Sequence, residues 1–140
     1  MKEASSLLRT KGLRATPGRI GLLESLIRHG TPISAEELHG AHTDLDLVTV
    51  YRTLQSFVST GLACEVRFKD AHVRYEFAKD AHHHHVVCTR CGVVNELPTC
   101  DFASLEKDVL KKTDNFASIE EHALEFFGTC SVCARTSPSQ

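Results

Sequence analysis

Apolar residues recur at helical spacing through the N-terminal half of the chain, and boundary signals divide them into separate helices. Thr16 caps the first of these helices, Pro17 suits its first turn, and Gly30 ends it. Residues 34–37 read Ser-Ala-Glu-Glu, a capping box that opens a second helix reaching about His42. The pattern therefore predicts two successive helices before the strongest helical segment of the chain.

That third segment runs from Leu47 to Thr60 and is followed by residues with the pattern of strands. Gly61 closes the helix, whose apolar face consists of Val50, Leu54, Phe57 and Val58. Residues 62–68 and 73–78 are short extended segments on either side of a polar turn. Three helices followed by a two-stranded hairpin predict a winged helix-turn-helix, whose third helix enters the major groove of DNA.

The second half of the chain mixes strands with a helix. Residues 82–87 and 93–97 are expected to be strands on either side of a tight cysteine turn, residues 102–112 a helix, and residues 116–127 a third strand. The helix is expected to turn an apolar side inward, made of Phe102, Leu105 and Val109. An α+β unit of about 60 residues is marginally stable alone, so it needs a metal ion, a partner subunit or both.

Charge also separates the two halves of a chain whose formal net charge is −2. Residues 1–69 hold nine Lys and Arg against seven Asp and Glu, whereas residues 70–140 hold seven against eleven. A basic N-terminal half suits a DNA-contacting module, although scattered solvated charges would give the same count. We predict a DNA-binding domain at 1–78, a hinge at about 78–82 and a metal-binding domain at 79–140.

The composition is that of an ordinary globular protein, with 41% apolar and 24% charged residues. No apolar run approaches the roughly 18 residues of a membrane span, and the N-terminus lacks the apolar core of a secretory signal. We therefore expect a cytoplasmic protein without membrane contact, in a compartment where thiols stay reduced. Six Cys and nine His are accordingly interpreted first as metal ligands.

Two Cys-x-x-Cys motifs, Cys88 to Cys91 and Cys130 to Cys133, offer four thiolates in two pairs. Two such turns complete a closed tetrahedral site of the kind that holds structural Zn²⁺. Two independent redox motifs are the alternative, but no thioredoxin-like context surrounds either pair. The sequence thus predicts one zinc ion held by all four sulfurs.

Four consecutive histidines, residues 82–85, form the second candidate metal feature. Side chains alternate faces along a strand, so His82 and His84 would face one way and His83 and His85 the other. One stretch of backbone could then serve two different ions, whereas the alternative is a solvated run with no ligand role. A zinc deaminase is excluded, because the required His-x-Glu and Pro-Cys-x-x-Cys patterns are absent.

Taken together, these motifs resemble the ferric uptake regulator superfamily of bacterial metal-responsive repressors, and within it the zinc uptake regulators. The likeness extends from about Leu8 to Cys133. It implies a homodimer with an N-terminal winged helix and a C-terminal α/β dimerisation domain. The segments that carry it are Leu13-Arg14-Ala15-Thr16-Pro17-Gly18-Arg19, Thr49-Val50-Tyr51-Arg52-Thr53-Leu54, Gly61-Leu62, Arg74-Tyr75-Glu76, the histidine run with Cys88-x-x-Cys91-Gly92, and Leu124-Glu125-Phe126-Phe127-Gly128.

The resemblance assigns DNA contacts to five residues. Tyr51 and Arg52 fall on the recognition helix, where a tyrosine can pack on thymine methyls and an arginine can pair with a base edge or a phosphate. Thr49 belongs to the same turn. Arg14 and Arg19 match basic positions near the minor groove and the backbone, and Arg14 there favours an A·T-rich operator. The implied homodimer favours an operator that is palindromic. A half-buried aromatic with a packing role is the alternative for Tyr51.

The resemblance also implies a regulatory metal site, with Glu76, His83, His85 and Glu96 at the matching positions. Iron sensors add a histidine from the loop before the second helix, but this loop contains Pro32 instead. Cys64 occupies a position that resembles a ligand position of zinc sensors, and a thiolate with imidazoles favours Zn²⁺ over Fe²⁺. A small buried side chain is the alternative for Cys64. A four-coordinate ion does not need both carboxylates, so one of them would orient a ligand.

A second site of the dimerisation domain is implied by the same resemblance. Its ligands would be His82, His84 and His122. Glu106 would join them if this chain has lost one residue, relative to the family, after the segment that aligns at residues 104–106. Cys100 matches no ligand position and is interpreted as a lone thiol.

The sequence therefore indicates a metal-dependent repressor of metal uptake or homeostasis genes, sensing Zn²⁺. The first alternative is an iron- or peroxide-responsive repressor of the same fold. The remote alternative is a zinc hydrolase, in which the helix carrying Tyr51 and Arg52 would have no role. We expect a regulator and not an enzyme.

Overall fold

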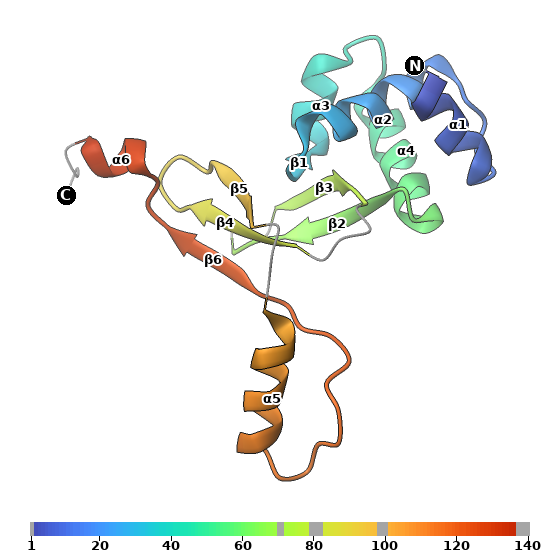
Figure 1. Ribbon diagram of the computed structural model, residues 1–140. Helices are drawn as coiled ribbons and strands as arrows, with labels where there is room; N and C mark the ends of the chain where they lie inside the picture. Colours follow the sequence, from blue (N-terminus) through green and yellow to red (C-terminus); the bar gives the residue numbers. More distant parts are fainter. Residues whose placement is uncertain (1, 70–71, 79–82, 98–100, 137–140) are drawn as a thin grey trace. The chain divides into compact units, whose positions relative to one another are not determined.

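A computed structural model of the chain describes residues 2–69, 72–78, 83–97 and 101–136. The chain divides into two compact units, Met1–Lys79 and Asp80–Gln140, and each contains its own three-stranded sheet (Figure 1). In the described part of the chain, every helix falls short of the length and apolarity that a membrane span requires.

The N-terminal unit contains the helices α1 (Lys2–Thr10), α2 (Pro17–His29), α3 (Ala35–Ala41) and α4 (Leu47–Thr60). Local signals set their ends. The side chains of Thr16, Ser34 and Asp46 each accept a hydrogen bond from a backbone N–H in the first turn of α2, α3 and α4. The helix-turn-helix formed by α3 and α4 agrees with the prediction, including both ends of α4.

The sheet of this unit has the antiparallel order β1-β3-β2, with β1 at Ile33–Ser34, β2 at Ala63–Arg67 and β3 at Val73–Phe77. The β2–β3 hairpin is the predicted wing, whereas the two-residue β1 has no sequence signature. One apolar core joins the helices to the sheet and includes Leu8, Leu22, Leu23, Leu26, Leu38, Val50, Leu54, Phe57, Leu62 and Tyr75. The predicted winged helix-turn-helix is confirmed.

The C-terminal unit consists of β4 (His84–Cys88), β5 (Val94–Leu97), α5 (Phe102–Lys112), β6 (Glu125–Gly128) and α6 (Ser131–Arg135). The central strand β4 pairs antiparallel with β5 and parallel with β6. Parallel pairing needs a long crossover, which the segment containing α5 supplies. The α+β class predicted for the chain is confirmed.

Two expectations for this unit are wrong. The third strand covers Glu125–Gly128 instead of residues 116–127, because it pairs with only four positions of the short β4. Leu105 and Val109 do not face inward: each is 38% exposed. The final helix α6 was not predicted either, since its five residues are too few for a periodic pattern.

Candidate nucleic-acid interface and metal centres

Helix α4 presents a polar face to solvent at the surface of the N-terminal unit. Its exposed side chains are Val48, Thr49, Tyr51, Arg52, Gln55 and Ser59. Asp46 fixes the start of this helix, because its Oδ1 accepts a hydrogen bond from the backbone N–H of Thr49 at 2.6 Å. That bond holds the pKa of the Asp46 carboxyl below its usual range. Asp46 thus fixes the residue at which α4 begins, and the exposed face of the helix is accessible to a ligand.

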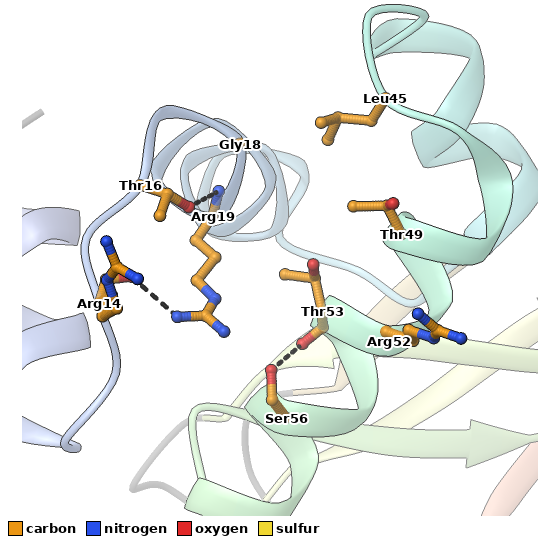
Figure 2. A pocket seen from close by; sticks show the side chains of 9 residues that line it. All are labelled: Arg14, Thr16, Gly18, Arg19, Leu45, Thr49, Arg52, Thr53 and Ser56. Carbon is orange, nitrogen blue, oxygen red and sulfur yellow. Dashed lines mark hydrogen bonds between the residues drawn. The ribbon is translucent and has the colours of Figure 1, made fainter.

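A groove of about 580 Å³ lies between the start of α2 and one side of α4 (Figure 2). Four of the five predicted DNA-contacting residues meet there, and none of the described residues that line the groove is acidic. The Arg19 guanidinium donates to the backbone carbonyl of Arg14 at 3.2 Å, which holds the Arg19 side chain beside the segment that carries Arg14. Three guanidinium groups without a carboxylate suit an anionic ligand such as a phosphate backbone. The lining residues are Arg14, Thr16, Gly18, Arg19, Leu45, Thr49, Arg52, Thr53 and Ser56.

Tyr51 is not among the residues of this groove and has a polar partner of its own. Its hydroxyl donates to Oε1 of Glu36 on α3 at 2.5 Å, and the residue is 36% exposed. The same bond raises the pKa of the Tyr51 phenol and lowers the pKa of the Glu36 carboxyl. The exposure predicted for Tyr51 agrees with the structure, but the tie to Glu36 was not predicted.

Gln55, one turn further along α4, is held in a similar way. Its Nε2 donates to Oε1 of Glu65 at 2.9 Å and to the hydroxyl of Tyr75 at 3.1 Å. Sequence reasoning missed Gln55, although its spacing of four residues from Tyr51 is a usable signal for a shared helix face.

The four predicted cysteines lie together in the C-terminal unit, with all four sulfurs within 4.8 Å of one another. Cys88 ends β4, and Cys91 lies in the turn before β5. Cys130 is the N-cap of α6, and Cys133 lies within this five-residue helix. The Sγ atoms of Cys91 and Cys130 are 3.7 Å apart. Two sulfurs bound to one tetrahedral zinc ion at about 2.3 Å are separated by about 3.8 Å. The donor set and its spacing therefore fit Zn²⁺.

Backbone groups around Cys88 favour its thiolate form. The backbone N–H of Cys130 donates to Sγ of Cys88 at 3.3 Å, and hydrogen bonds from the N–H groups of Cys91 and Cys130 lower the pKa of Cys88 to about 6. Cys133 is opposite in character, because hydrogen bonding with the Cys130 side chain raises its pKa to about 12. Four sulfurs this close cannot all carry negative charge without a cation, which is the situation that a metal ion resolves.

A pair of histidines forms a second candidate centre in the same unit. The Nε2 atoms of His84 and His122 are 2.9 Å apart, and the Phe102 ring stacks on His122 with centroids 4.2 Å apart. At this distance the two rings share a hydrogen bond, and a tetrahedral ion about 2.1 Å from each nitrogen would need them about 3.4 Å apart, so the pair would have to open slightly to hold one. Glu106 lies half-buried on α5. His82, the remaining predicted ligand, lies outside the described residues, as does Cys100.

The predicted regulatory ligands occupy paired strand positions inside each unit. In the N-terminal unit Cys64 lies opposite Glu76 across the β2–β3 ladder, and Glu76 is only 4% exposed. Desolvation raises the pKa of the Cys64 thiol, and the charge of Glu76 raises it further. In the C-terminal unit His85 lies opposite Glu96 across the β4–β5 ladder.

His83 completes the set in the C-terminal unit. Its ring lies edge-on to that of His85, with centroids 5.0 Å apart, and a ligand nitrogen of each lies within 4.8 Å of the other. Each unit therefore carries part of a possible ligand set that combines carboxylate with thiol or imidazole.

Comparisons with known proteins give one consistent result. The sequence model of the ferric uptake regulator family matches residues 10–127. The ferric uptake regulation protein of Bordetella parapertussis is 33% identical over 138 residues, which cover 93% of this chain and 96% of that protein. The peroxide operon regulator of Bacillus subtilis is 28% identical over 139 residues, covering 96% and 94%. The solved ferric uptake regulator of Vibrio cholerae is similar with a TM-score of 0.75 at 30% identity, covering 90% of this chain and 98% of that one.

Proposed function

This chain belongs to the ferric uptake regulator family of metal-responsive transcriptional regulators, and on that premise we propose that it is a zinc-responsive repressor of metal uptake or homeostasis genes. The observation that carries the choice of zinc is the pairing of Cys64 with Glu76 on the wing. A thiolate in the ligand set favours the tetrahedral N/S coordination of Zn²⁺ over the oxygen- and nitrogen-rich octahedral coordination of Fe²⁺.

The N-terminal unit is the DNA-binding part of this proposal. Arg52 and Tyr51 on α4 contact the major groove, assisted by Thr49 from the same turn, while Arg14 and Arg19 contact the backbone and the adjacent minor groove. The arginine groove beside α4 supports this role (Figure 2). A homodimer places two such helices on an A·T-rich palindrome, with half-sites about one helical turn apart.

The sensed ion is held by residues from both units. The N-terminal unit supplies Cys64 and Glu76, and the C-terminal unit supplies His83, His85 and Glu96, of which one carboxylate orients a ligand instead of binding. Such a shared ion stabilises the arrangement of the dimer in which both recognition helices fit the operator. Metal and DNA then strengthen each other's binding by the same factor, because the coupling is reciprocal.

Two further ions belong to the proposal, and the first of them is structural. Cys88, Cys91, Cys130 and Cys133 hold a permanent zinc ion that ties the end of β4 to α6. His84 and His122, with His82 and Glu106, hold a second ion in the dimerisation domain. Reduced thiols and access to chromosomal DNA are both available in the cytoplasm, where we expect the protein to act.

An iron- or peroxide-responsive repressor is the second candidate, and the likeness to the peroxide operon regulator favours it. The deciding experiment is a metal competition on the purified dimer with the four-cysteine ion in place. Zinc-dependent operator binding that requires Cys64 supports the zinc sensor. Operator binding that responds to Fe²⁺ and is unchanged by Cys64→Ser supports the alternative. The relatives are transcription regulators, so a hydrolase is not proposed.

A further inference from the structure

Two acidic residues hold two side chains on the exposed face of α4. Tyr51 and Gln55 are four residues apart, so they lie on the same side of the helix. Tyr51 is bonded to Glu36 of α3, and Gln55 is bonded to Glu65 of β2 and to Tyr75 of β3. Both carboxylate residues are themselves exposed. The face that we assign to DNA is therefore fixed from both flanks by the neighbouring helix and by the wing.

The chemistry of these bonds decides what the face can offer to a ligand. An ionised carboxylate only accepts hydrogen bonds, so the phenol proton of Tyr51 is committed to Glu36. A glutamate is ionised at neutral pH, and the bond from Tyr51 lowers the pKa of Glu36 further. Gln55 gives its amide N–H groups to Glu65 and Tyr75. With these protons committed, the two residues can offer a ligand only acceptors: a lone pair of the Tyr51 phenol oxygen and the amide oxygen of Gln55.

We propose that Glu36 and Glu65 are positioning residues that turn Tyr51 and Gln55 into hydrogen-bond acceptors, so that α4 selects an amino group on a base edge. This inference rests on the proposed DNA-binding function. In the major groove an amino donor is presented by adenine N6 and by cytosine N4, whereas guanine and thymine present acceptors there. Arg52 supplies donors from the neighbouring side of α4, where it lines the arginine groove, so α4 offers donors on one side and acceptors on the other.

The competing explanation is purely electrostatic. Two carboxylates beside a DNA-binding face repel phosphates, which would lower affinity for every sequence alike. The two explanations differ for conservative variants. Glu36→Gln removes the charge but keeps an oxygen that accepts from Tyr51, whereas Glu36→Ala removes both. In the same way, Glu65→Gln removes only the charge, whereas Glu65→Ala removes both the charge and the oxygen that accepts from Gln55.

The first experiment measures the affinity of the zinc-loaded dimer for a duplex selected from a random pool by the wild-type protein, and for a scrambled duplex of equal length. The ratio of the two affinities is the readout. We expect Glu36→Ala and Glu65→Ala each to reduce the ratio about tenfold, and the two glutamine variants to keep most of it. Glu37→Ala is the matched control, because it removes the same charge from the same turn of α3 without removing a described bond to α4.

The second experiment identifies the base amino group that α4 contacts. Each adenine of the selected duplex is replaced in turn by purine, which lacks the amino group, and each cytosine by its analogue without N4. We expect at least one replacement to weaken wild-type binding about tenfold and to leave the binding of Gln55→Ala or Glu65→Ala unchanged. If no replacement weakens the wild-type protein, the proposed readout is wrong.

A third measurement needs no DNA. The chain has two tyrosines and no tryptophan, so each phenol can be followed by NMR of labelled tyrosine, with Tyr51→Phe as the assignment. The pKa of Tyr51 is raised by its bond to Glu36. We expect it to fall toward the ordinary value in Glu36→Ala and to stay in Glu37→Ala.

The outcomes distinguish a failure of the proposed DNA-binding function from a failure of the proposed role of Glu36 and Glu65. A wild-type dimer that selects no duplex overturns the proposed function and this inference together. A wild-type dimer that selects a duplex while Glu36→Ala and Glu65→Ala keep the full ratio overturns this inference alone. Equal gains in affinity for both duplexes in the alanine and glutamine variants would establish the electrostatic explanation in its place.

Discussion

Cys64 lies directly opposite Glu76 in the antiparallel ladder of β2 and β3, so a thiol and a buried carboxylate project from the same face of the wing. The next pair of the ladder is Glu65 with Tyr75, which projects from the other face because side chains alternate along a strand. That second pair holds Gln55 of α4. One hairpin therefore carries the proposed metal ligands on one face and a contact with the recognition helix on the other.

Replacing Cys64 by serine tests the proposed zinc site. We expect the free Zn²⁺ concentration required for half-maximal operator binding to rise by at least tenfold, because serine replaces a soft thiolate with a poor zinc ligand. The measurement is operator binding by fluorescence anisotropy in zinc buffers. The variant should still retain one zinc ion per chain at the four-cysteine cluster, and loss of that ion would show that the substitution acts elsewhere.

Replacing Cys130 by serine tests the structural zinc. The extended apolar core belongs to the N-terminal unit, whereas Val87 and Cys88 are the buried apolar residues among those described in the C-terminal unit. We expect the variant to lose its bound zinc and the hydrogen-exchange protection of β4, with the N-terminal unit still folded. Zinc analysis and exchange mass spectrometry measure both quantities. Unchanged protection of β4 in zinc-free protein would contradict a structural role for the ion.

Replacing Arg19 by alanine tests the groove beside α4. We expect affinity to fall to a similar extent for selected and scrambled duplexes, and the slope of log affinity against log salt to decrease by about one. A phosphate contact has this effect, since it positions the protein without reading sequence. Binding titrations over a range of salt concentrations provide the slope, with Arg28→Ala on the same helix as a charge-matched control. An unchanged slope would show that Arg19 does not contact a phosphate of the DNA.

Replacing Asp46 tests whether its carboxylate caps the N-terminus of α4. The hydrogen bond from Thr49 lowers the folded-state pKa of Asp46, so its stabilising effect is present above the ordinary carboxyl pKa near 4 and is lost as pH falls through the folded value. We expect Asp46→Ala to lower the melting temperature by a few degrees at pH 7. Asp46→Asn should retain most of the stability at pH 7, because asparagine is also a good cap.

The sign of the pH effect gives this prediction a second check. The difference in melting temperature between wild type and Asp46→Ala should shrink when the pH is lowered from 7 to below 4. A difference that is constant over this range would mean that the Asp46 carboxylate is not the cap.

Replacing His122 by alanine tests the second centre of the C-terminal unit. The two facing ring nitrogens of His84 and His122 would be reduced to one, so we expect the metal content of the loaded dimer to fall by one ion per chain. The four-cysteine ion should remain. Metal analysis after equilibrium dialysis measures the loss, and the same stoichiometry in variant and wild type would exclude this site.

Local signals made much of the fold predictable. Caps and helix-ending glycines act within one turn, which is why both ends of α4 agree with the sequence prediction. The cysteine cluster was predictable for a similar reason, because each Cys-x-x-Cys turn fixes two sulfurs by itself. In contrast, the extent of β6 depends on the length of its partner β4, and sequence alone does not contain that information.

The contacts of α4 show where sequence reasoning ends. The face that carries Tyr51 follows from helical periodicity, but Glu36 is 15 residues away and reaches Tyr51 only through the turn between α3 and α4. Leu105 and Val109 are a second example, in which the sequence predicts burial and the structure shows exposure. Their spacing indicates an apolar face on α5, and only the structure shows that the described part of a single chain leaves this face exposed.

In the proposed mechanism, an ion held by ligands from two units controls the fit of the dimer to DNA. The most direct measurement is an operator-binding titration of the dimer at buffered free Zn²⁺ and, anaerobically, at buffered Fe²⁺, with the four-cysteine ion retained throughout. We expect affinity to rise steeply with free Zn²⁺ in the wild-type protein, and Cys64→Ser to shift this rise to higher concentrations. Equal affinity of the zinc-loaded and zinc-stripped dimers for the operator would contradict this mechanism.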